Sequence, residues 1–97
     1  MIEKDGDGLR VTVPMLIGNA LGLLEGGRGF LNEAPAGGTW LIDLSLVMET
    51  DSSALSVIFG WLRTAHTRGV TLRIANLPAN MVSQAALYGV SESLPLA

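Results

Sequence analysis

Apolar and polar residues alternate in two short stretches of the chain, and each stretch therefore predicts a strand with one buried face. Residues 8–14 place apolar side chains at positions 9, 11 and 13, and residues 70–75 place them at positions 70, 72 and 74. The polar positions between them lie on the opposite face, which we expect to be the more exposed one. That face would carry Arg10, Thr12, Thr71 and Arg73.

Two further strands are predicted beside these. Trp40 to Leu44 is a nearly continuous apolar run, which is typical of a central strand. The run Asp5-Gly6-Asp7-Gly8 is typical of a tight turn. Residues 2–4 are therefore expected to form a hairpin with the strand that follows them.

Three longer stretches repeat apolar residues at spacings of three and four, as an amphipathic helix does. Pro14 suits the first turn of the first one, although five internal glycines disfavour a helix there. Gly69 and Gly89 follow the other two and are typical of helix ends. The predicted helices run from Pro14 to near Asn32, from about Ser52 to Thr67, and from Asn76 to Tyr88, and Ser91 to Ala97 form a short tail.

The predicted order is strand, strand, helix, strand, helix, strand, helix. Strand–helix–strand units place parallel strands side by side through right-handed crossovers. We therefore expect one α/β domain over residues 1–97, with a small mixed β-sheet and helices packed on one face. A chain of 97 residues that is 48% hydrophobic and 15% charged can build one compact core and has no room for a second.

Charge and composition narrow the function. The net charge is −3 and the six Lys and Arg residues are scattered along the chain, so the sequence predicts no nucleic-acid binding. Cysteine is absent, which excludes disulfides and thiolate metal sites. The polar start of the chain is unlike a signal peptide, and the apolar stretch from Met15 to Leu24 is too short to cross a bilayer. We expect a soluble cytoplasmic protein.

Catalytic arrangements are poorly supported. Asp51, Ser52 and His66 are the one apparent triad, but Ser52 and His66 would lie about 21 Å apart along a continuous helix. Asp43 and Asp51 could act as paired carboxylates, yet Asp51 is better explained as a helix cap. Nucleotide-binding and metal-binding motifs are missing. The sequence therefore predicts no catalytic residue, cofactor or metal.

The start of the second helix is the best candidate for a binding surface. Asp and Ser side chains accept hydrogen bonds from the free N–H groups of a helix start, and residues 48–53 can end the strand, turn and cap this helix. The helix buries a stripe of Ala54, Leu55, Ile58, Trp61, Leu62 and Ala65. Its opposite arc is mostly small and uncharged, and consists of Ser52, Ser53, Ser56, Gly60, Arg63, Thr64 and Thr67.

A smooth arc of small residues, with Phe59 at its boundary, lets another protein approach closely. An ordinary solvated helix face is the alternative, although such faces usually carry more Lys and Glu. The predicted partner-binding residues are Thr50, Asp51, Ser52, Ser53, Ser56, Phe59 and Arg63.

The segment Leu41-Ile42-Asp43-Leu44-Ser45-x-Val47-x-x-x-Asp51-Ser52-Ser53-Ala54-Leu55 resembles the signature of STAS domains, the anti-sigma-factor-antagonist fold. Ala54 stands where that family often has glycine. Shorter segments resemble the MlaB branch of the family: Trp61-Leu62-Arg63-x-Ala65, Asn76-Leu77-Pro78, Leu87-Tyr88-Gly89-Val90 and Leu94-Pro95-Leu96.

The resemblance implies two roles for Ser52. In MlaB-like proteins the equivalent hydroxyl lies at the contact with the ATPase subunit of an ABC transporter that moves phospholipids between the inner and outer membranes. This role implies a cytoplasmic subunit that reaches the membrane only through the transporter. In the wider family the equivalent hydroxyl is phosphorylated by an anti-sigma-factor serine kinase, which makes the domain a phosphorylation-switched antagonist.

Overall fold

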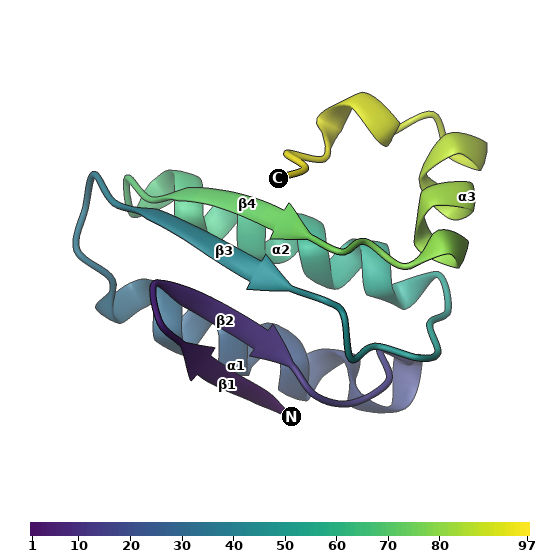
Figure 1. Ribbon diagram of the computed structural model, residues 1–97, viewed down its shortest axis with the longest axis horizontal. Coiled ribbons are helices and arrows are strands. Elements are labelled where there is room, and N and C mark those ends of the chain that lie inside the picture. The colour runs from purple at the N-terminus through teal and green to yellow at the C-terminus, as the bar shows by residue number, and fades with distance from the viewer.

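A four-stranded mixed sheet forms the centre of the computed structural model, which describes residues 1–97. The spatial order follows the chain order, and β1 pairs antiparallel with β2, whereas the β2–β3 and β3–β4 pairs are parallel (Figure 1). This arrangement confirms the predicted mixed sheet. The strands are β1 (Ile2–Asp5), β2 (Gly8–Val11), β3 (Thr39–Asp43) and β4 (Thr71–Ala75).

Two helices cover one face of the sheet, and the third lies at its end. Helices α1 and α2 run side by side behind the strands, and α3 follows the carboxyl end of β4 and contacts α2 (Figure 1). The other sheet face stays open, and Leu41 of the central strand is 41% exposed there. The helices are α1 (Ala20–Glu33), α2 (Ser53–Thr67) and α3 (Ala79–Leu87), with short 3-10 turns η1 (Ile17–Asn19) and η2 (Ser91–Ser93).

The first helix begins later than its pattern indicated. The Asn19 side chain accepts a hydrogen bond from the Leu16 N–H and donates one to the Pro14 carbonyl, and this closes a turn instead of a helix. Met15 pairs with Thr50 in an isolated bridge. The prediction of a helix starting at Pro14 is therefore wrong by about a turn and a half, because tertiary pairing holds this segment extended.

The C-terminal segment is more than a short tail. The Ile74 N–H donates to the Pro95 carbonyl, and the Ala97 N–H donates back to the Ile74 carbonyl. Leu96 forms a parallel bridge with Ile74, so the last residues cover the outer edge of β4. An edge with unpaired N–H and C=O groups invites other chains to pair with it, and this edge is partly closed by the protein itself.

The seam between α1 and α2 is unusually tight at Trp61. This side chain is fully buried, and its Nε1 donates to the carbonyls of Leu23 and Leu24, both at 3.2 Å. A Cβ on Gly27 would lie 2.2 Å from Trp61 Nε1, so only glycine fits there. The same seam buries Gly60 under Leu24, which corrects its assignment to the exposed arc of α2.

Candidate partner-binding site at the start of α2

The loop between β3 and α2 is anchored at both ends. At its start the Asp43 carboxylate accepts hydrogen bonds from the backbone N–H (2.9 Å) and hydroxyl (3.0 Å) of Ser45, which closes a tight turn. At its end the Met15 N–H donates to the Glu49 carbonyl, and the Asp51 N–H donates to the Met15 carbonyl. Buried Leu44 and Val47 hold the middle of the loop on the core. The start of α2 is thus fixed in position.

Asp51 caps α2, as its sequence position indicated. Ser52 already has helical backbone angles (φ −63°, ψ −22°), so Asp51 precedes the first helical residue. The Asp51 carboxylate accepts hydrogen bonds from the Ser53 N–H at 2.9 Å and from the Ile17 N–H at 2.8 Å. The same group also accepts the Ser53 hydroxyl. One carboxylate therefore joins the start of α2 to the segment that precedes α1.

The two neighbouring serines differ in what their hydroxyls can do. The Ser53 hydroxyl is occupied by Asp51. Ser52 is exposed and its side chain makes no hydrogen bond within the chain. A free hydroxyl beside the positive end of a helix dipole can bind a partner or carry a phosphate. Of the two, Ser52 is the group available to another molecule.

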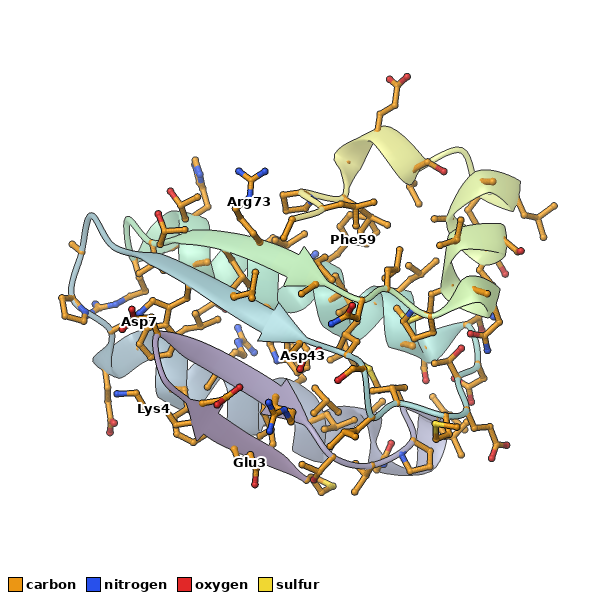
Figure 2. All side chains as sticks on the ribbon, viewed as in Figure 1. Glu3, Lys4, Asp7, Asp43, Phe59 and Arg73 are labelled. Carbon is orange, nitrogen blue, oxygen red and sulfur yellow. The ribbon has the colours of Figure 1, made fainter.

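The other predicted contact residues divide into outward and inward groups. Ser56 and Arg63 are exposed on the same side of α2 as Ser52, and Phe59 is half-buried at the edge of that side. Thr50 is half-buried, and its hydroxyl oxygen is enclosed with no hydrogen-bond partner. In Figure 2, Phe59 lies toward β4 and the C-terminal segment, whereas Asp43 marks the end of β3. The residues Ser52, Ser56 and Arg63 form the accessible row.

The local sequence pattern did not indicate three exposed large apolar side chains, two beside this row and one in the loop that precedes it. Ile17 and Leu21 are 76% and 72% exposed, and Met48, in the loop before Ser52, is 86% exposed. Ile17 and Leu21 fall within the predicted first helix but outside its buried stripe. Their spacing of four positions would have placed both on one exposed side of that helix. Ile17 and Leu21 line a groove of about 440 Å³ between α1 and α2. The residues that line it are Ile17, Ala20, Leu21, Leu24, Ser53, Ser56, Val57 and Arg63.

The arrangement does not support acid–base or nucleophilic catalysis. Helix α2 is continuous, so Ser52 and His66 lie at its opposite ends and cannot share a hydrogen bond. Asp43 and Asp51 have separate sets of partners. Hydrogen bonds from Ser53 and the Ile17 backbone lower the pKa of Asp51 and outweigh the effect of burial. A general acid of a carboxylate pair needs a raised pKa, whereas both carboxyls have lowered values.

Asp43 is expected to make folding sensitive to acid. Burial by itself would raise its pKa, but hydrogen bonds from Asn76, Ser45 and Arg10 prevail and lower the value to about 2 from 3.8. A lowered folded-state pKa stabilises the fold above pH 3.8 and loses that contribution as the pH falls towards 2. Asp43→Asn should reduce the acid-dependent loss of unfolding free energy by about 1–2 kcal/mol between pH 5 and 2.

This effect is measured by urea unfolding at a series of pH values. Asp7→Asn is the matched control, because its carboxylate makes no side-chain hydrogen bond or ion pair in the structure. An Asp43→Asn variant whose stability falls with acid as steeply as that of the parent protein would contradict the assignment.

Comparison with known proteins agrees with this architecture. A family model described as "Mlab, STAS domain" matches residues 6–96. The crystal structure of a Thermotoga maritima protein assigned as an anti-sigma factor antagonist superposes with a TM-score of 0.76 and 19% sequence identity, covering 99% of this chain and 83% of that one. At this identity the superposition shows a shared fold. No curated protein sequence matches the chain.

Proposed function

Because this chain belongs to the MlaB, STAS domain family, we propose that it is a non-enzymatic accessory subunit that binds the ATPase of an ABC-type phospholipid transporter. The observation that carries the proposal is the accessible row of Ser52, Ser56 and Arg63, bordered by exposed Ile17 and Leu21. Met48, in the loop four residues before Ser52, is exposed as well. Exposed apolar residues beside a helix start that presents small side chains are typical of a surface that another protein covers. No helix of the chain is both long and apolar enough to span a bilayer, and the membrane would be reached through the partner.

The contact would combine apolar burial with one hydrogen bond. Covering Ile17, Leu21 and Met48 would contribute about 1–2 kcal/mol for each side chain, since most of their surface is now in water. The Ser52 hydroxyl would add about 1 kcal/mol if the partner supplies a hydrogen-bonding group. A domain that binds one conformation of the ATPase better than the others shifts the ATPase towards that conformation. This subunit would thereby regulate the transporter without chemistry of its own.

A second function, phosphorylation-switched antagonism of an anti-sigma factor, is supported by the state of Ser52. Its hydroxyl is exposed and unoccupied, so its oxygen can attack the terminal phosphate of a nucleoside triphosphate held by a kinase, with the nucleoside diphosphate as leaving group. A phosphate would add about −1.5 to −2 charge beside the Asp51 carboxylate. The start of a helix can accommodate that charge, but a closely packed interface cannot. The protein would then release its partner when phosphorylated.

A pulldown from the source organism separates the two functions. The tagged protein and its Ser52→Glu variant serve as baits after mild crosslinking, and the captured proteins are identified by mass spectrometry. The transporter function is supported if the parent bait recovers an ATPase with Walker motifs together with a permease and the Ser52→Glu bait does not. Recovery of a serine-kinase anti-sigma factor instead would overturn it in favour of the second function.

A further inference from the structure

A second groove between α1 and α2 gathers three of the six basic residues of the chain. It lies over the C-terminal halves of the two helices, has a volume of about 570 Å³ and has no hydrophobic lining residue. The basic residues are scattered along the sequence, but the fold brings Arg28 together with Arg63 and Arg68, which lie 35 and 40 positions further along the chain. The lining consists of Glu25, Arg28, Gly29, Asn32, Arg63, Thr64, Thr67 and Arg68.

Two of these guanidinium groups are held in place by neutral oxygens. Arg28 Nε donates to the Thr64 hydroxyl oxygen at 3.2 Å, and Arg68 Nη2 donates to the Asn32 carbonyl at 3.0 Å. Arg63 makes no side-chain hydrogen bond or ion pair. The one carboxylate in the groove, Glu25, lies 3.3 Å from Arg28 Nη1. Three positive charges against one negative leave a net charge of +2 in a protein whose net charge is −3.

We propose that this groove receives an acidic segment, rich in Asp or Glu, of the same partner that covers Ser52. The inference rests on the proposed function and adds a second contact to it. Arg63 lines both this groove and the apolar groove beside Ser53, so the two surfaces are continuous. Along α2 they extend from Ser53 to Arg68, about 22 Å for 15 helical steps. One continuous partner segment can therefore span both.

Charge complementarity favours a protein segment over a membrane or a free phosphate. Planar guanidinium groups form bidentate hydrogen bonds with carboxylates. The three arginines lie on α1 and on the C-terminal part and end of α2, so they can bind several carboxylates spaced along a segment. An open groove cannot dehydrate a small anion, whereas a segment anchored at Ser52 brings its carboxylates to the groove at high effective concentration. A flat anionic membrane would meet a concave surface on a protein that is negatively charged overall.

The groove can be tested without the natural partner. A hexaglutamate peptide is titrated at low ionic strength into ¹⁵N-labelled protein, with hexalysine, inorganic phosphate and phosphatidylglycerol vesicles as comparisons. We expect amide chemical shift changes that are confined to residues 25–32 and 63–68. Only hexaglutamate, and none of the three comparison ligands, should cause them. The double variant R28Q/R68Q should lose them and R73Q should retain them, because Arg73 lies on the far edge of the sheet (Figure 2). Dispersed or absent changes, or binding of phosphate or vesicles alone, would overturn the proposal.

The same variants are then measured against the purified ATPase. R28Q/R68Q should weaken binding about tenfold to thirtyfold at 50 mM salt, and the difference should shrink at 500 mM salt because mobile ions screen exposed charges. R73Q should bind as the parent protein does. Equal affinities of R28Q/R68Q and R73Q for the ATPase would contradict the acidic-segment contact and leave the proposed function standing. Absence of binding by the parent protein would instead contradict the proposed function.

Discussion

Ser52→Glu is expected to weaken binding of the transporter ATPase by about a hundredfold or more. The variant places a second negative charge next to the Asp51 carboxylate, in a surface that the partner must cover closely. A charge enclosed at an interface without a counter-charge loses its hydration and gains little in return. Binding is measured by isothermal titration calorimetry with the purified ATPase. The fold should persist, because carboxylates are compatible with helix starts and Ser52 makes no side-chain hydrogen bond.

Two controls make this result specific to the site. Thr71→Glu introduces the same charge at an exposed position at the first residue of β4, the opposite end of the sheet from the start of α2. It should bind as the parent protein does. Ser52→Ala removes the hydroxyl without adding charge and should weaken binding about fivefold, as expected for one lost hydrogen bond. Full affinity of Ser52→Glu, with an unchanged melting temperature and circular dichroism spectrum, would rule Ser52 out of the interface.

Gly27→Leu should destabilise the fold by about 3 kcal/mol or more. Any side chain at this position meets the indole of Trp61, since even a Cβ would lie 2.2 Å from its Nε1. The ring cannot move away easily, because it is fully buried and donates to the carbonyls of Leu23 and Leu24. Thermal and urea unfolding measure the loss, which corresponds to a melting temperature about 15 °C lower for a domain of this size.

Gly29 in the same helix is the matched control. Gly29 is exposed and a Cβ at this position would have no heavy atom within 4 Å, so a leucine side chain would extend from the helix into open space. The higher helix propensity of leucine should raise the unfolding free energy by up to about 1 kcal/mol. The two variants therefore differ in sign although both replace an α1 glycine with leucine. Similar unfolding free energies for both would show that the α1–α2 seam is looser than this structure describes.

The local patterns of the sequence were sufficient for the order of the elements and for part of the site. The helix starts predicted at Pro14 and Asn76 were wrong, because α1 begins at Ala20 and α3 begins at Ala79, after Asn76 in a left-handed conformation (φ 59°). Alternation at residues 8–11 and 71–75, the buried stripe of α2, and the capping residue Asp51 each depend on neighbours within a few positions. The STAS fold is confirmed by the family match and the superposition. The function of the row around Ser52 stays a prediction. Its position on α2 followed from cap chemistry at Asp51 and Ser52 and from the helical period that places Ser56 and Arg63 on the same side.

Contacts between residues far apart in the chain were decided by the tertiary structure. Pairing of Met15 with Thr50 delayed the start of α1 and brought Ile17 beside Asp51. The packing of α1 on α2 buried Gly60 and gathered Arg28, Arg63 and Arg68 around one groove.

The sequence by itself determined the order of the strands and helices, their approximate positions and the residue that caps α2. These features depend on side-chain periodicity and on hydrogen bonds within one turn of the chain. Only the tertiary structure decided which faces of α1 and α2 meet. This packing also decided which apolar and basic side chains stay at the surface along the seam. That outcome depends on the fit of Trp61 against Gly27, a contact between residues 34 positions apart that no local pattern encodes.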